Sequence, residues 1–156
     1  FGNRDVMSGG EGNDINIWAP GDGSDAFLGG AGSRDAMIFG LIDRDANNVP
    51  TLAPVVGTFS ETGVPTANVT GSPGFCRLED VRDTDLGFDY LVRFFVRSTG
   101  NLAVTIRLRD VEQVFCTSES GGAITFANLR KRYAQFVEIA PGDVQRKNKE
   151  VSQLIR

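Results

Sequence analysis

Four aspartates recur near the start of the chain, each in a glycine-rich turn and each followed by a short apolar segment. They are Asp5, Asp14, Asp25 and Asp35, with spacings of nine, eleven and ten residues. The segment Gly9–Ile17 has the glycines and the aspartate of the nonapeptide G-G-x-G-x-D-x-U-x, where U is a large apolar residue, and carries Asn16 at the U position between Ile15 and Ile17. Carboxylates beside turns with accessible carbonyl groups supply the oxygen ligands that Ca²⁺ prefers. The chemistry that these residues predict is metal binding.

Less regular copies of this nonapeptide lie on both sides of this segment, at Gly2–Met7, Pro20–Leu28 and Gly29–Ile38. Glycine permits the positive φ angles of a tight turn that exposes carbonyl oxygens. The apolar residues that follow each aspartate predict a very short strand. We expect two or three calcium ions, and the candidate metal-binding residues are Asp5, Gly10, Gly12, Asp14, Gly21, Gly23, Asp25, Gly30, Gly32 and Asp35.

The spacing of the aspartates favours a two-sided arrangement in which alternate copies lie on the same side. Such an arrangement pairs Asp5 with Asp25 and Asp14 with Asp35. Two alternatives remain open at this point. The similarity of residues 1–10 to residues 31–40 would fit a three-sided coil, and the aspartates could form ordinary turns without metal.

Acidic residues are concentrated where the repeats are. Residues 1–48 hold eight acidic and three basic residues, whereas residues 127–156 hold three acidic and seven basic ones. The acidic repeats argue against nucleic acid as the main partner, because phosphate contacts need clustered lysine and arginine. The basic tail is expected to be a solvated surface. A membrane-spanning helix needs about 18 consecutive apolar residues or more, and we expect no transmembrane segment.

The chain contains no histidine. This removes the commonest general base and the usual partner of serine and cysteine nucleophiles, and we expect no enzymatic activity. The two cysteines, Cys76 and Cys116, form no C-x-x-C motif. In an exported protein they are expected to be bonded to each other. Two separate buried thiols are the alternative.

Alternating apolar residues after the repeats predict further strands. The clearest are Phe88–Val96 and Asn101–Arg109, joined by a hairpin turn at Ser98–Asn101. Shorter strands are expected at Val55–Phe59, Ala67–Thr70, Val111–Phe115 and Ile124–Phe126. The tail from Asp143 is expected to be helical.

The repeats, together with Ile106–Phe115 and Gly122–Phe126, resemble the RTX, or haemolysin-type calcium-binding, family. The resemblance covers residues 1–45 and 101–129 and leaves residues 46–100 unplaced. It implies a parallel β-roll that folds on meeting calcium outside the cell, after export of the unfolded chain. The two cysteines depart from the family pattern, since RTX chains are usually poor in cysteine.

The expected fold class is therefore all-β, with a short parallel β-roll, a β-rich region and a C-terminal helix. The expected division is residues 1–45 for the β-roll, 46–142 for a β-rich domain in which Cys76 and Cys116 could be bonded, and 143–156 for the helix. Because Phe1 enters the chain in mid-repeat, we expect a piece of a larger protein.

The leading hypothesis is a non-catalytic calcium-binding module of a secreted bacterial protein, located outside the cell or on its surface. A second hypothesis is a structural subunit of a surface layer, matrix or filament, which calcium would lock onto its own copies or an extracellular polymer. A third is a carboxylate-based glycan-processing domain around Glu79, Asp80 and Asp83. Calcium-dependent self-association would favour the second, and activity that survives calcium removal would favour the third.

Overall fold

The computed structural model describes residues 4–18, 21–40, 43–44, 50–51 and 72–138. Three expected elements lie outside these ranges: the strands at Val55–Phe59 and Ala67–Thr70 and the C-terminal helix at 143–156. Within them the chain is all-β and contains no helix. The strands are β1 (Val6–Ser8), β2 (Ile15–Trp18), β3 (Ala26–Leu28), β4 (Ala36–Phe39), β5 (Asp43–Arg44), β6 (Pro50–Thr51), β7 (Gly74–Asp80), β8 (Tyr90–Val96), β9 (Leu102–Arg109), β10 (Gln113–Thr117), β11 (Ile124–Asn128) and β12 (Val137–Glu138).

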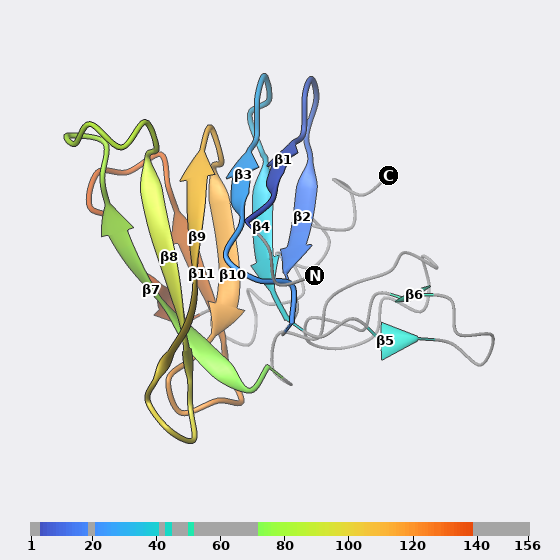
Figure 1. The fold of residues 1–156 in the computed structure, drawn as a ribbon, viewed down its shortest axis with the longest axis vertical. Helices are drawn as coiled ribbons and strands as arrows, with labels where there is room; N and C mark the ends of the chain where they lie inside the picture. Colours follow the sequence, from blue (N-terminus) through green and yellow to red (C-terminus); the bar gives the residue numbers. More distant parts are fainter. Residues whose placement is uncertain (1–3, 19–20, 41–42, 45–49, 52–71, 139–156) are drawn as a thin grey trace.

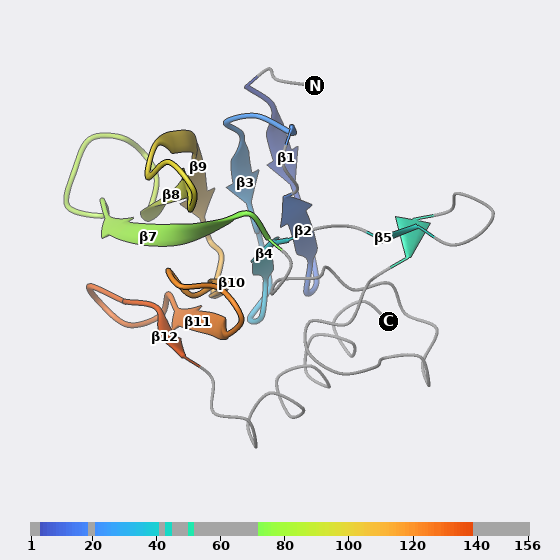
Figure 2. The same ribbon diagram turned by 90° about the horizontal axis from the view of Figure 1, so that it is seen from below.

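Two five-stranded mixed sheets make up most of the described chain. Their strand orders are β1-β3-β9-β8-β7 and β12-β11-β10-β4-β2, and β5 and β6 form a separate antiparallel pair. Figure 2 shows the two sheets as facing layers, with β1, β3 and β7 to β9 in one and β2, β4 and β10 to β12 in the other. Side chains that point between the layers form the core.

The first four strands alternate between the two sheets. β1 pairs with β3 in parallel, and β2 pairs with β4 in parallel. Each glycine-rich turn therefore carries the chain from one sheet to the other after only three or four strand residues. The apolar residues of each short strand are thereby returned to the same core.

Strands far along the chain extend both sheets. β9 pairs in parallel with β3, and β10 pairs in parallel with β4. On their other sides β9 and β10 pair antiparallel with β8 and β11. The hairpin expected at Ser98–Asn101 joins β8 to β9. Strands from the regions 1–45 and 46–142 consequently share both sheets (Figure 1).

An aromatic cluster fills the core where the repeat strands meet β8. The ring centroids of Trp18 and Phe94 lie 4.8 Å apart, and those of Trp18 and Phe39 lie 5.6 Å apart. A disulfide joins Cys76 on β7 to Cys116 on β10, which confirms the expected pairing. Because β7 and β10 belong to different sheets, the bond links the two layers.

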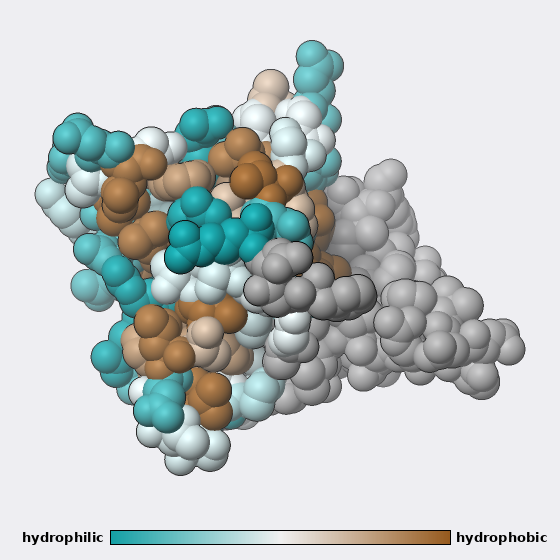
Figure 3. Space-filling model, viewed as in Figure 1, coloured by the Kyte–Doolittle hydropathy of each residue, from teal (hydrophilic) through white to brown (hydrophobic). Residues whose placement is uncertain are grey.

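The outer surface of the layer that faces the viewer in Figure 3 carries separate hydrophobic areas broken by hydrophilic ones. Phe75 on β7 and Phe95 on β8 are only partly buried and stack with centroids 5.5 Å apart, and the Arg77 guanidinium lies over both rings. In the described ranges no helix is long and apolar enough to cross a membrane.

Candidate functional site

Three turns lie at one end of the molecule, where the chain crosses between the sheets (Figure 1). They are residues 9–14 between β1 and β2, residues 29–35 between β3 and β4, and residues 110–112 between β9 and β10. The first two belong to the nonapeptide repeats. The third comes from the distant part of the chain that extends both sheets.

The two repeat turns stack on each other through their backbones. The Ala31 N–H donates to the Gly10 carbonyl at 2.8 Å, and the Gly12 N–H donates to the Ala31 carbonyl at 2.9 Å. The Asn13 side-chain oxygen accepts from the backbone N–H groups of Ser33 and Arg34. Backbone and side chain thus fix the distance between neighbouring turns.

The repeat aspartates pair as the two-sided arrangement predicts. The Asp25 Oδ1 accepts from the Asp5 N–H at 3.0 Å, and the Asp35 Oδ1 accepts from the Asp14 N–H at 2.7 Å. In both contacts the two aspartates immediately precede residues that pair in parallel, Val6 with Ala26 and Ile15 with Ala36. The pairing predicted from the spacing is therefore confirmed, in place of the three-sided alternative.

In the row formed by Asp14 and Asp35, each carboxylate keeps one oxygen without a partner. The Oδ2 atoms of both residues are buried and accept no hydrogen bond. Asp35 is completely buried. Its burial raises the pKa of the carboxyl, and the negative charges of Asp14 and Asp110 raise it further. Buried carboxylate oxygens without partners are costly, so this row is a place of unbalanced negative charge.

Glycines make room for these carboxylates. A Cβ at Gly9 would collide with the Asp14 Oδ2, and a Cβ at Gly29 would lie 2.7 Å from the Asp35 Oδ2. A Cβ at Gly32 would lie 2.9 Å from both Asp35 carboxylate oxygens. The candidate glycines that hold positive φ angles, between 82° and 105°, are Gly10, Gly12, Gly21, Gly23 and Gly30.

The residues of this row fit a calcium ion. The unpartnered oxygens lie in glycine-rich turns, and Ca²⁺ accepts about six to eight carboxylate and carbonyl oxygen ligands in a flexible geometry. In the described part of the chain, no three or more His, Cys, Asp or Glu side chains come together as a metal-binding group. A calcium ion held here would thus take many of its ligands from backbone carbonyls.

The second aspartate pair lies at the opposite end, where the chain passes from β2 to β3. Asp25 is buried and Asp5 is exposed. The Trp18 indole N–H donates to the Gly23 carbonyl at 2.9 Å, so this turn is tied to the aromatic core. Asp25 has no buried carboxylate oxygen without a partner.

The structure places one further acid in the Asp14 row, and the repeat pattern does not identify it. The Glu112 Oε2 accepts from the Asp35 N–H at 2.7 Å. Burial raises the pKa of Glu112, and the nearby charge of Asp35 adds to this effect. No repeat glycines precede Glu112. The sequence marks Glu112 only by its position between two predicted strands, in the segment Ile106–Phe115 that resembles RTX chains.

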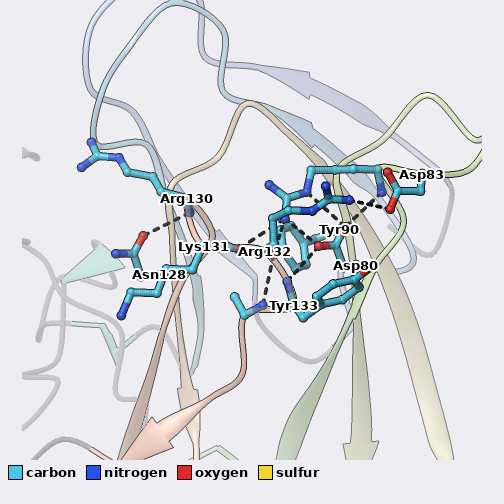
Figure 4. A network of polar contacts seen from close by, with 10 residues as sticks. Asp80, Asp83, Tyr90, Asn128, Arg130, Lys131, Arg132 and Tyr133 are labelled. Atoms are coloured by element: carbon cyan, nitrogen blue, oxygen red, sulfur yellow. Dashed lines mark hydrogen bonds and ion pairs between the residues drawn. The ribbon is translucent and has the colours of Figure 1, made fainter.

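The acids of the glycan-processing hypothesis occupy a different environment. Asp80 has a side chain only 3% exposed, and the Arg82 guanidinium bound to it holds the pKa of its carboxyl far below the usual range. The Asp80 carboxylate also accepts from the Tyr133 N–H at 3.0 Å (Figure 4). Each of the three acids has an arginine partner, in the ion pairs Glu79–Arg93, Asp80–Arg82 and Asp83–Arg132. These contacts account for the three carboxylates as structural ion pairs.

Comparison with known proteins gives no relative for this chain. No family model, no curated protein and no solved structure matches it.

Proposed function

We propose that this chain is a non-catalytic calcium-binding module, in which β1 to β4 form a short parallel β-roll of the RTX type. The observation that carries the proposal is the pair of buried, unpartnered carboxylate oxygens of Asp14 and Asp35. They lie in two stacked turns, one in the segment that has every glycine and the aspartate of the nonapeptide and the other in a later copy. A divalent cation would supply the positive charge that this row lacks.

Calcium binding would be coupled to the folding of the repeats. The glycine-rich turns lose much conformational entropy when they become ordered. Without metal, the Asp14 and Asp35 carboxylates repel each other inside the fold. A ligand that binds only the folded state stabilises it by mass action. We therefore expect the repeats to become ordered, or markedly more stable, as calcium is added.

The proposed location is outside a bacterial cell. The Cys76–Cys116 disulfide supports this proposal, because disulfides persist in oxidising environments and are rare in the cytosol. Delivery as part of a larger secreted protein belongs to the same proposal.

A second candidate is the calcium-locked structural subunit. It is favoured by the positions of β1 and β2, which form one edge of each sheet among the described strands. Val6 on β1 is 64% exposed. Unpaired strand edges promote association with other chains. Sedimentation with and without calcium separates the candidates, because only the subunit assembles when calcium is added.

The experiment that tests the leading proposal is a calcium titration by calorimetry, followed by circular dichroism. The wild type should bind two or three ions with saturation and gain β signal. Asp14→Asn should bind fewer ions or bind them more weakly. The matched control is Asp83→Asn, which alters an exposed aspartate paired with Arg132 and should bind calcium like the wild type. A chain that is fully folded in chelator and silent to calcium would overturn the proposal.

A further inference from the structure

We propose that the β9–β10 turn, residues 110–112, forms a further calcium site with the turn of residues 29–35, and that Glu112 takes the place of the repeat aspartate in it. This inference rests on the proposed function, because it adds a site to the same row of carboxylates. The new site would be built by two parts of the chain that are far apart in sequence. The repeat motif alone assigns no metal-binding role to the later part.

The strand register places Glu112 at the next position of the aspartate row. Ile15 lies opposite Ala36 in the β2–β4 pair, and Ala36 lies opposite Gln113 in the β4–β10 pair. The residues immediately before these three are Asp14, Asp35 and Glu112. One row therefore carries three acids in succession.

The hydrogen bonds repeat in the same way along the row. The Asp14 N–H donates to the Asp35 carboxylate at 2.7 Å, and the Asp35 N–H donates to the Glu112 carboxylate at 2.7 Å. The Glu112 N–H donates in turn to the Asp35 carbonyl at 3.0 Å. Glu112 thus makes the contact to Asp35 that Asp35 makes to Asp14.

The backbone of the third turn also stacks like that of a repeat. The Gly9 N–H donates to the Leu28 carbonyl at 2.9 Å, and the Gly29 N–H donates to the Arg109 carbonyl at 2.8 Å. Asp110 has a positive φ of 57°, a conformation that glycines supply in the repeats. The third turn has three residues between its strands, against seven in the turn of residues 29–35. The longer side chain of glutamate compensates for this shorter turn.

The unpartnered oxygen of Asp35 lies beside Gly29, close to the third turn. Asp35 is completely buried, and its Oδ2 accepts no hydrogen bond. This Oδ2 would lie 2.7 Å from a Cβ built on Gly29, and the Asp110 carbonyl oxygen would collide with the same Cβ. A carboxylate oxygen and a carbonyl oxygen from neighbouring turns therefore converge beside Gly29. Such a combination of ligands suits Ca²⁺.

The charges around Glu112 are mostly negative. The acids Asp35 and Asp110 interact electrostatically with its carboxylate, and Arg130 is the basic group that does so. Arg130 is exposed, and its guanidinium donates to the Ser33 carbonyl in the turn of residues 29–35. One exposed arginine thus lies near three acids, Asp35, Asp110 and Glu112. A divalent cation would neutralise the remaining negative charge.

The test is the number of calcium ions bound by the disulfide-bonded chain, measured by calorimetry. Glu112→Gln should bind one ion fewer than the wild type, and Asp14→Asn should also bind one fewer. The double variant should bind two fewer, because the two changes affect different sites. The matched control is Glu138→Gln, since Glu138 is exposed on β12 at the far edge of the sheet. It should bind like the wild type.

Two outcomes separate this inference from the proposed function. If the wild type binds no calcium, both fail. If Asp14→Asn loses an ion and Glu112→Gln binds as the wild type does, only the inference is overturned. Should Glu112→Gln fail to fold, Glu112→Asp keeps the charge on a shorter side chain. It should bind one ion roughly tenfold more weakly or worse, and unchanged affinity for every ion would overturn the inference.

Discussion

Buried carboxylates have hydrogen-bond partners in one half of this molecule and lack some of them in the other. The repeat half comprises β1 to β4 with their turns, and the antiparallel half comprises β7 to β11. In the antiparallel half, the buried Asp80 carboxylate accepts hydrogen bonds from Arg82 and from the Tyr133 N–H. In the repeat half, Asp14 and Asp35 each retain a buried oxygen with no partner.

Arg97 provides a second example from the antiparallel half. Its guanidinium donates to four backbone carbonyls, those of Ser72, Gly74, Ser118 and Glu119. It therefore satisfies carbonyl groups from the ends of strands in both sheets. The antiparallel half thus supplies its own cations, whereas the two unpartnered oxygens of the repeat half are where the proposed calcium ion would bind.

The largest expected loss of stability comes from removing the disulfide that links β7 to β10 in the antiparallel half. The bond joins residues 40 apart in sequence, and a loop of this length predicts a loss of roughly 3–4 kcal/mol in the free energy of unfolding. Urea denaturation of the Cys76→Ala, Cys116→Ala variant measures it. The loss should be equal in calcium and in chelator, because neither cysteine belongs to the repeat turns. A loss confined to the calcium-bound state would contradict the claim that the antiparallel half is stable independently of calcium.

A smaller loss of stability is expected when Asp80 loses its ion-pair partner Arg82. Arg82→Met leaves the buried carboxylate without its main partner. Unpairing a buried charge costs about 3–5 kcal/mol, and we expect about 2–3 kcal/mol because the Arg82 side chain is 27% exposed. The control is Arg132→Met, which removes an exposed ion pair and should cost less than about 1 kcal/mol. Equal losses in both variants, measured by urea denaturation, would show that Asp80 does not depend on Arg82.

The smallest expected effect is on how stability depends on pH, with opposite signs in the two halves. Asp35 and Glu112 have raised pKa values in the fold. Without calcium, their contribution to stability is therefore full below their unfolded pKa values of about 4 and is lost as the pH rises through the folded ones. Asp80 has a lowered pKa, so its contribution is present above its unfolded pKa and is lost as the pH falls towards the folded one.

Region-resolved hydrogen exchange in chelator checks these signs. After correction for the intrinsic exchange rate, protection of β2 and β4 should be greater at pH 5 than at pH 7, whereas β7 and β8 should change little. Asp35→Asn cannot titrate at this position and should reduce the pH effect in β4. Greater protection of the repeat strands at pH 7 than at pH 5 would contradict the assignment of these carboxyls.

The aspartate pairing could be predicted from the sequence because it is local and periodic. Alternate copies of a regular turn must lie on the same side, so spacing alone relates Asp14 to Asp35. The strands Tyr90–Val96 and Leu102–Arg109 were also predicted, with small differences at their ends. Alternating apolar residues and a hairpin turn specify both strands.

The place of Glu112 could not be predicted in the same way. Its contact with Asp35 spans 77 residues and depends on β10 pairing with β4. No periodic pattern links those two segments. Nor does the sequence indicate which buried carboxylates carry an arginine partner, since Arg82 and Asp80 meet through the turn that follows β7.

The most direct test of the central claim is hydrogen exchange of the whole chain with and without calcium at neutral pH. We predict that calcium greatly increases protection in β1 to β4 and their turns, while β7 and β8 are protected to a similar degree in both conditions. Protection of the repeat strands that is already complete in chelator and unchanged by calcium would contradict the claim that this half needs a cation from solution.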